Sequence, residues 1–400
     1  MDADRRAEIL AKGRPSSFWG GEPSLGGWHT EEEVEAAVRV IREAMDWTKG
    51  YGGMKETEEF EQAFAEYCGT ADCVAINGAG SGLDMAMMCL DLEPEDEVIS
   101  PAINFKAEHL AVIGQGARLV LCEIDPATFN VDPEDVERRI TPNTRAIAPV
   151  HMNGLSAPMD DLLEIAERNP HPKHGPLKVI GDAARACGGG YKGTKIGKKA
   201  WMTVFSFHTQ KLMTTLGEGG GITTDDPEVG RRLRGLRQFG GGTGEWGTNY
   251  KMTNVQAAVG QVQLRRLDEM IGRRVRLANK RTEMLQHIPE FTLPTEPPEC
   301  DHTYYLYTIL VPKEWAGAKR DKLCAIMKEE YNVGCVVANP PTYMSQAWVK
   351  KHTEGQHLPL SDELGARLFC PSLHPLMTDE NNEYVCAALD ETVGRVREGG

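Results

Sequence analysis

Short apolar runs alternate with helical segments between residues 70 and 225, and this alternation restricts the possible folds more than any other feature of the chain. Runs bounded by turn residues predict buried strands at 73–76, 97–101, 119–121, 146–150 and 178–181. Strands that alternate with helices are typical of an α/β domain in which a mostly parallel sheet lies between two layers of helices. Ligands of such sheets bind beyond the carboxyl ends of the strands. We therefore expect the functional residues to follow the strands directly.

A carboxylate and a lysine follow two predicted strands in the stretch from residue 178 to residue 224. Asp182 ends the apolar run 179–181, and Lys211 comes shortly after the β-rich run 203–207. Pyridoxal phosphate (PLP) enzymes need such a pair, because a lysine holds the cofactor as a Schiff base and a buried carboxylate keeps its pyridine nitrogen protonated. An isolated aspartate would more often cap a helix, and an isolated lysine would more often face solvent. The residues around the pair favour the functional interpretation.

Three motifs surround this pair. Residues 181–186 are Gly-Asp-Ala-Ala-Arg-Ala, residues 205–211 are Phe-Ser-Phe-His-Thr-Gln-Lys, and residues 217–220 are Gly-Glu-Gly-Gly. Together they resemble the core motifs of the DegT/DnrJ/EryC1/StrS family, whose members are PLP-dependent aminotransferases of fold type I acting on sugars and cyclitols. The resemblance implies a large α/β domain, with a mostly parallel seven-stranded sheet between helices, and a small C-terminal α+β domain.

The resemblance also implies roles for residues of these motifs. Asp182 pairs with the pyridine nitrogen, Lys211 forms the internal aldimine, and Ser206 binds the cofactor phosphate. One branch of the family has histidine in place of the lysine and performs dehydration. The presence of Lys211 therefore favours transamination.

A glycine-rich loop at 77–82 follows the first predicted strand and precedes a helix expected at 83–90. Such a loop is an ordinary tight turn or an anion site, because a helix N-terminus offers unpaired backbone N–H groups and a positive dipole end. The loop aligns with the phosphate-binding Ser-Gly-Thr-Ala turn of the family, which implies that Gly80 and Ser81 hold the phosphate. This chain differs from the family pattern at both positions, so we expect backbone contacts.

Two further residues are assigned to the cofactor by the resemblance. Phe105 lies four residues after Pro101, where the family has an aromatic ring that stacks on the pyridine and excludes water from one face; the alternative is a plain core residue. Arg185 lies three residues after Asp182, where the family usually has glutamine. It could contact the phenolic oxygen of the cofactor, face an anionic substrate, or pair with a surface carboxylate.

Residues 249–253, Asn-Tyr-Lys-Met-Thr, resemble the family's Asn-Tyr-Arg-Met segment. In the family this segment reaches across a dimer, and its asparagine contacts the neighbouring subunit's cofactor phosphate. The resemblance thus implies a homodimer with active sites at the interface, and it assigns Asn249 to cofactor binding. Lys251 replaces the usual arginine, which keeps the charge but loses the bidentate geometry.

The chain is predicted to divide into an irregular N-terminal arm (1–30), a large PLP-binding domain (31–250) and a long linking helix with the small C-terminal domain (251–400). Thr30 and Glu33 predict a capping box at the start of a helix. Further predicted elements are a basic helical run at 231–237 with a solvated face, helices at 255–285, 319–331 and 379–393, and strands at 305–311 and 333–338.

The composition of the chain limits which classes of partner and which cellular compartment are expected. A net charge of −15 argues against nucleic acid and anionic membranes as partners. The N-terminus lacks the apolar region of a signal peptide, and no run approaches the roughly 20 apolar residues of a membrane helix. The ten cysteines form no Cys-x-x-Cys and no zinc-type cluster with histidine, which predicts reduced thiols, no metal site and a cytoplasmic location.

These observations predict a PLP-dependent transaminase that works by a ping-pong mechanism. The resemblance implies glutamate or glutamine as the amino donor and a keto group on a sugar, a nucleotide sugar or a cyclitol as the acceptor. Residues 150–155 and 211–214 also resemble the family's aminohydroxybenzoate synthases, which is a first alternative. A second alternative is a regulatory protein that binds PLP without turnover. The sequence has no motif for a particular acceptor.

Overall fold

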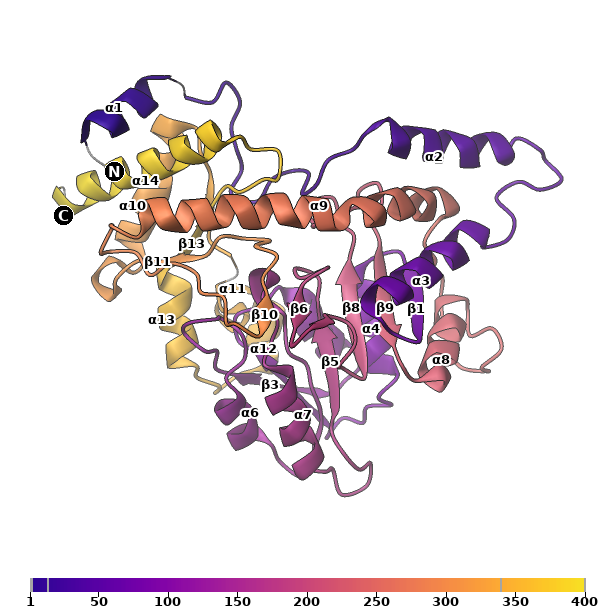
Figure 1. Ribbon diagram of the computed structural model, residues 1–400. Helices are drawn as coiled ribbons and strands as arrows, with labels where there is room; N and C mark the ends of the chain where they lie inside the picture. Colours follow the sequence, from indigo (N-terminus) through magenta and orange to yellow (C-terminus); the bar gives the residue numbers. More distant parts are fainter. Residues whose placement is uncertain (1–2, 13, 339, 399–400) are drawn as a thin grey trace.

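The computed structural model describes residues 3–12, 14–338 and 340–398 (Figure 1). Within these residues, seven strands form one sheet in the order β1-β9-β8-β5-β4-β2-β3. Their bounds are β1 Asp72–Ile76, β2 Glu97–Pro101, β3 Arg118–Cys122, β4 Thr144–Ile147, β5 Lys178–Asp182, β8 Met202–Ser206 and β9 Gly220–Thr224. Neighbouring strands from β8 to β3 are parallel, whereas β9 runs antiparallel to β1 and β8. The predicted mostly parallel, seven-stranded α/β fold is confirmed.

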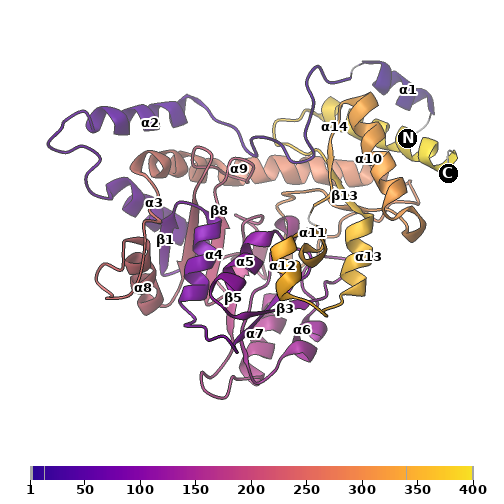
Figure 2. The same ribbon diagram turned by 180° about the vertical axis from the view of Figure 1, so that it is seen from behind.

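Helices cover both faces of the sheet, as the two opposite views show (Figures 1 and 2). The alternation of side chains along each strand produces the two faces. In β1, Val74 and Ile76 share a core with α4, whereas Cys73 and Ala75 share a core with α3. The helices that precede, connect or follow the strands of this sheet are α3 Lys55–Cys68, α4 Ala79–Met88, α5 Lys106–Gly114, α6 Pro133–Arg139, α7 Met159–Arg168 and α8 Pro227–Arg237.

A single long helix, α9 (Asn254–Leu285), connects the sheet to the C-terminal part of the chain (Figure 1). Thr253 and Gln256 form a capping box at its start. Its 32 residues span about 48 Å at 1.5 Å per residue. The boundary predicted at residue 250 stays a prediction, although α9 begins close to it.

The C-terminal part packs a small antiparallel sheet against helices. Within the described ranges, this sheet has the order β11-β13-β12, and a second small sheet has the order β10-β6-β7. The strands are β6 Gly190–Tyr191, β7 Thr194–Lys195, β10 Cys300–Asp301, β11 Ile309–Leu310, β12 Cys335–Val336 and β13 Leu368–Pro371. The helices are α10 Ala318–Tyr331, α11 Thr342–Ser345, α12 Ala347–His352, α13 Pro359–Arg367 and α14 Asp379–Glu398. The strand predicted at 305–311 is wrong in extent: its strand residues are Ile309–Leu310, whereas the backbone N–H groups of Thr303 and Leu306 donate to the Gly154 and Asn153 carbonyls.

The N-terminal arm is not irregular throughout, which corrects the prediction. It begins with helix α1 (Ala3–Lys12), which lies beside α14; Arg6 pairs with Asp390 at 3.1 Å. The arm then crosses the molecule and ends at Thr30, where the predicted capping box with Glu33 starts α2 (Glu31–Glu43). No helix in the described residues is long and apolar enough to cross a bilayer.

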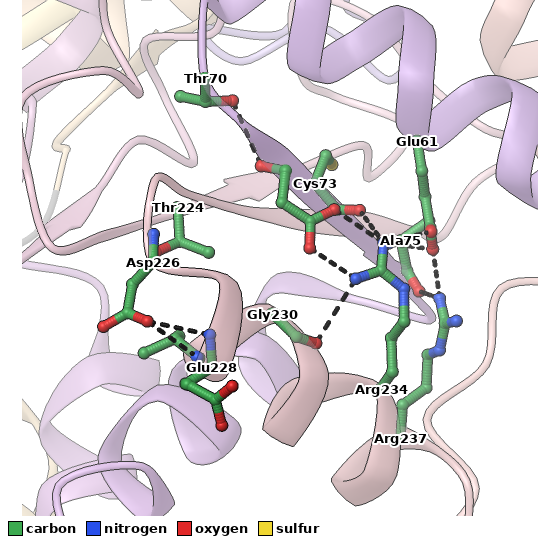
Figure 3. Close-up of polar contacts among 12 residues, drawn as sticks. Glu61, Thr70, Cys73, Ala75, Thr224, Asp226, Glu228, Gly230, Arg234 and Arg237 are labelled. Atoms are coloured by element: carbon green, nitrogen blue, oxygen red, sulfur yellow. Dashed lines mark hydrogen bonds and ion pairs between the residues drawn. The ribbon is translucent and has the colours of Figure 1, made fainter.

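The basic run on α8 is not a simple solvated face, which corrects a second prediction (Figure 3). Arg237 is buried and donates to Glu61 on α3 and to the Ala75 carbonyl, at 2.7 Å for the latter. Arg234 donates to Glu61 at 3.0 Å and to both carboxylate oxygens of Asp72. These charge-assisted bonds attach α8 to β1 and α3.

Candidate active site

A cavity of about 610 Å³ opens at the carboxyl ends of the parallel strands. This volume is typical of a small-molecule site. The loop after β1, the residues after β2, the end of β5 and the end of β8 all contribute to its wall. The lining residues include Glu22, Asn77, Gly78, Gly80, Ser81, Asn104, Phe105, Asp182, Arg185, Ser206, His208, Lys211 and Glu218.

Asp182 is the last residue of β5 and its side chain is only 5% exposed. Its Oδ1 accepts the backbone N–H of Ala184 at 2.9 Å. Burial raises the pKa of this carboxyl group, while the Ala184 N–H, Arg185 and Lys211 act in the opposite direction. The Asp182 carboxyl group is therefore fixed in orientation and buried in the cavity wall, which suits the recognition of a cationic N–H group.

The N-terminus of α4 forms one end of the cavity. The helix starts at Ala79, four residues earlier than predicted, so Gly80 and Ser81 lie in its first turn rather than in a loop. The first N–H groups of a helix have no partner inside the helix and attract anions. A Cβ added at Gly80 would meet no atom within 4 Å, and both Gly80 and Ser81 line the cavity. Ser206, at the end of β8, lines the same cavity and adds a hydroxyl group.

Lys211 projects into the cavity from the segment that follows β8, and its side chain is 15% exposed. Its Nζ lies 2.9 Å from the phenolic oxygen of Tyr305 and 3.8 Å from Oε1 of Glu22. Burial and the neighbouring Arg185 lower the pKa of this amine to about 8, against the opposing effect of Glu22 and Asp182. Roughly a fifth of such an amine is neutral near pH 7.4, compared with about a thousandth at the usual lysine pKa, and a nucleophile or a general base requires the neutral form.

Phe105 and Arg185 lie on the same cavity wall as the other predicted residues. Phe105 immediately precedes α5 and is 55% exposed, so it is not a core residue. Arg185 is buried, and its Nη1 donates to Oδ1 of Asn153 at 2.8 Å. The alternative that Arg185 pairs with a surface carboxylate is therefore wrong.

Asn249 is the predicted site residue that does not line this cavity. It is exposed in the segment before α9, and its Oδ1 accepts the N–H of Lys251 at 3.4 Å. A residue that serves a neighbouring subunit would lie outside the cavity of its own chain. Its assignment to cofactor binding stays a prediction.

Sequence reasoning missed Glu22 and Tyr305, which both contact Lys211. Glu22 belongs to the arm, and Tyr305 falls in the strand predicted at 305–311. Neither residue has a local signal, because the three side chains meet only through contacts between segments that are distant in the sequence. Among the described residues, no group of three or more His, Cys, Asp and Glu side chains could hold a metal ion.

Comparison with known proteins agrees with this geometry. A sequence model of the DegT/DnrJ/EryC1/StrS aminotransferase family matches residues 29–390. The chain belongs to this family. It is therefore a PLP-dependent aminotransferase, and the resemblance noted in the sequence is confirmed.

Several relatives match this aminotransferase along most of their length. GDP-perosamine synthase of Caulobacter vibrioides is 34% identical over 365 residues, covering 88% of this chain and 94% of that protein. The dTDP-3-amino-3,4,6-trideoxy-alpha-D-glucose transaminase of Streptomyces venezuelae is 32% identical, covering 91% of this chain and 93% of that protein. The crystal structure of S. venezuelae DesV in complex with a ketimine intermediate has a TM-score of 0.81 at 32% identity, covering 90% of this chain and 94% of that chain.

The residues of this chain fit PLP chemically. The cavity combines a buried carboxylate for a ring N–H (Asp182), a helix N-terminus with a neighbouring hydroxyl group for a phosphate (Ser206), an amine for the aldehyde (Lys211) and an aromatic ring at the mouth (Phe105). A buried carboxylate that faces a cavity needs a cationic or N–H partner, because burial without one is costly. The site thus offers a partner to the ring nitrogen, the phosphate and the aldehyde of the cofactor.

Proposed function

We propose that this aminotransferase transfers an amino group from glutamate or glutamine to a keto group on a nucleotide-activated sugar. The observation that supports it is the convergence of Asp182, Ser206 and Lys211 on one cavity at the carboxyl edge of the sheet. The named activities of two relatives, GDP-perosamine synthase and a dTDP-amino-sugar transaminase, favour a nucleotide sugar over a free cyclitol as the acceptor.

In this proposal, each residue of the cavity has one task. PLP, when bound, supplies an electron sink for the bonds at the substrate carbon. Asp182 keeps the ring nitrogen protonated, and the first turn of α4 together with Ser206 holds the phosphate. Phe105 shields one face of the ring from water, and Arg185 donates to an oxygen of the cofactor or of an anionic substrate.

Lys211 carries the covalent bond and moves the proton. With PLP bound, the amino donor would displace this amine, which would then be free to take the proton from the donor's α-carbon and pass it on. Its pKa of about 8 suits both directions of transfer, since neither the neutral amine nor the ammonium ion is rare near that pH. The second half-reaction uses the same steps in reverse on the keto acceptor.

We propose further that the enzyme is a homodimer and works in the cytoplasm. Apolar side chains on α2 and in the turn after it are exposed, among them Ile41, Met45 and Trp47, with Trp47 at 90%. Clusters of this kind mark protein interfaces. Every cysteine lies in the described part of the chain and is a free thiol, as expected in a reducing compartment.

A donor and acceptor screen tests the proposal. Purified enzyme is incubated with glutamate or glutamine and with a panel of nucleotide keto sugars and cyclitol ketones, and the aminated products are detected by mass spectrometry. Borohydride reduction followed by peptide mapping should fix the cofactor on Lys211. K211A should lose turnover, whereas K178A, at the exposed start of β5, should keep it. Parent-rate turnover by K211A would refute the assignment.

A further inference from the structure

The arm residues 19–28 are attached on both sides of the active site. On one side, Trp19 forms two backbone hydrogen bonds with the C-terminal part of the chain. The Trp19 N–H donates to the Asn332 carbonyl at 3.1 Å, and the Trp19 carbonyl accepts the Gly334 N–H at 2.6 Å. On the other side, the Gly26 N–H donates to the Thr209 carbonyl at 2.9 Å. The segment between these two attachments is thereby fixed across the cavity.

The approach of the arm to Lys211 leaves no room for a side chain. A Cβ added at Gly26 would lie 2.1 Å from the carbonyl oxygen of Lys211 and 2.2 Å from that of Gln210. The Thr209 hydroxyl also donates to the Ser24 carbonyl at 2.9 Å. The arm and the lysine segment therefore behave as one packed unit.

Glu22 lies between these attachments and points into the cavity. Its Oε1 accepts the hydroxyl of Tyr305 and is 3.8 Å from Nζ of Lys211. A carboxylate in this position directs the Tyr305 O–H away from the lysine, because the hydroxyl has a single proton to donate. The lone pairs of the phenolic oxygen are then available to the amine.

Tyr305 is held rigidly from its backbone. It is 2% exposed, the carbonyl of Tyr305 accepts a bond from Arg274 at 3.4 Å, and the next N–H, of Leu306, donates to the Asn153 carbonyl at 3.3 Å. Its oxygen is 2.9 Å from Nζ of Lys211, and that Nζ is 4.6 Å from the ring centroid. The phenol thus presents one fixed acceptor to an otherwise flexible side chain.

We propose that Tyr305 and Glu22 form a positioning pair, which holds the Lys211 amine in one orientation whenever that amine is free of the cofactor. This inference rests on the role of Lys211 in the proposed function and deepens it. A released lysine has many rotamers, and proton transfer requires a fixed direction of approach. The pair supplies that direction from residues outside the family motifs of this chain.

The charges around Lys211 give Glu22 a second effect. Arg185 faces the amine from the segment after β5 and disfavours the ammonium form, as burial does. Glu22 from the arm and Asp182 from β5 favour the ammonium form. Glu22 therefore offsets Arg185 and keeps the amine able to hold the proton that it takes from the substrate.

The chain contains a matched control pair next to the test pair. The hydroxyl of Tyr304 donates to Glu296 at 3.3 Å, and Tyr304 is also buried. This Tyr–Glu pair has the same chemistry as Tyr305 and Glu22, but it does not line the cavity. Variants Y304F and E296Q thus report the structural effect of losing such a pair.

The first test uses cofactor-free enzyme and does not depend on turnover. Acetic anhydride labels lysine amines only when they are neutral, so the labelling of Lys211 as a function of pH, measured by peptide mass spectrometry, gives its midpoint. E22Q removes a carboxylate about 4 Å away and should lower the midpoint by roughly one pH unit. E296Q should leave it in place. An unmoved midpoint in E22Q, or an equal shift in E296Q, would overturn the inference.

The second test separates positioning from binding in the loaded enzyme. Y305F keeps the ring and removes only the hydroxyl, so kcat of the donor half-reaction should fall about tenfold, with a KM for the donor changed less than twofold. Y304F should match the parent enzyme. Equal kcat values in Y305F and Y304F would contradict the pair.

Peptide mapping after borohydride reduction distinguishes the two possible failures. If the cofactor is fixed on Lys211 and the two tests fail, only the positioning pair is wrong. If the cofactor is fixed on another residue, the proposed function itself fails.

Discussion

The Asp182 carboxylate accepts the backbone N–H of Ala184 at 2.9 Å, and this bond fixes the carboxylate at the carboxyl end of β5. The peptide that holds it belongs to the same turn as Arg185, so the turn sets both the position and the charge environment of the carboxylate. Asp182 is thus oriented by its own loop before any ligand binds.

Replacing this carboxylate by an amide should uncouple cofactor binding from catalysis. D182N keeps the shape and the Ala184 bond but cannot stabilise a protonated ring nitrogen. We expect the donor half-reaction to slow roughly 10²–10³-fold, as when other preorganised electrostatic groups are removed, while PLP still binds. Stopped-flow absorbance with glutamate measures the rate, and D160N, at a half-buried position in the first turn of α7 outside the cavity, is the control. A D182N rate within twofold of the parent would exclude the assigned role.

The fold was predictable because its signals are local. Each strand of the parallel sheet is a short apolar run, and the carboxyl ends of parallel strands meet at one edge. That rule alone brings Asp182, the Gly80 turn and Phe105 together. Lys211 and Ser206 followed from a motif whose residues are adjacent in the sequence. Seven of the eight predicted site residues consequently line one cavity.

The missed residues depend on contacts between distant segments. Glu22 and Tyr305 are 283 positions apart, and Arg237 is 176 positions from Glu61. Helical spacing places Arg237 on α8, but it does not show that its side chain meets the buried carboxylate of Glu61 on α3. Capping chemistry predicts the start of α2 correctly, but it gives no signal for α1, whose buried residue Ile9 shares a core with residues of α14.

The Ser206 hydroxyl should matter for the phosphate alone. A hydrogen bond to a charged group contributes about 1.5–3 kcal/mol, so S206A should weaken PLP binding by roughly 10- to 100-fold. Pyridoxal, which lacks the phosphate, serves as the control ligand: its affinity should be the same for S206A and the parent. Fluorescence titration of cofactor-free enzyme gives both constants. An equal loss for the two ligands would place Ser206 elsewhere in the site.

Asn249 offers a test of a shared active site. If it serves the neighbouring subunit, N249A and K211A carry their defects in different sites of a mixed dimer. Subunit exchange between the two inactive variants should then restore about a quarter of the parent activity, since half of the dimers are mixed and each has one intact site. A mixture of K211A with D182N should stay inactive, because both residues line the cavity of one chain. No recovery in the first mixture would confine Asn249 to its own subunit.

The buried histidines predict a loss of stability in mild acid. Burial lowers the pKa of His109, His151 and His302 from 6.5 to about 4. Between these values the unfolded chain binds protons at these three rings that the folded chain does not, so their contribution to the free energy of unfolding decreases as pH falls from 6.5 toward 4 and is constant above 6.5. The urea midpoint should therefore be lower at pH 5.5 than at pH 7.5.

Selective labelling of histidine tests the same prediction residue by residue. The ring resonances of the three buried histidines should not titrate between pH 7.5 and 5.5 in the folded enzyme, whereas they should titrate in urea. Titration of these rings in the folded enzyme within that interval would contradict the burial argument.

Arg237 and Arg231 lie on the same helix, and their replacement should have very different effects on stability. The side chain of Arg237 is 4% exposed and its partner Glu61 is 6% exposed, whereas Arg231 is 60% exposed and pairs with Glu228 within one turn. Removing one partner of a buried ion pair leaves an uncompensated charge and costs about 3–5 kcal/mol. R237M should lower the free energy of urea unfolding by about that amount, and R231M should change it little, as is usual for surface pairs.

The double variant R237M/E61Q tests whether the unpaired charge of Glu61 causes the loss. It should recover part of the free energy of unfolding, because the amide of glutamine carries no charge. Equal stabilities of R237M and R231M would show that Glu61 is neutralised by Arg234 alone, which donates to it at 3.0 Å.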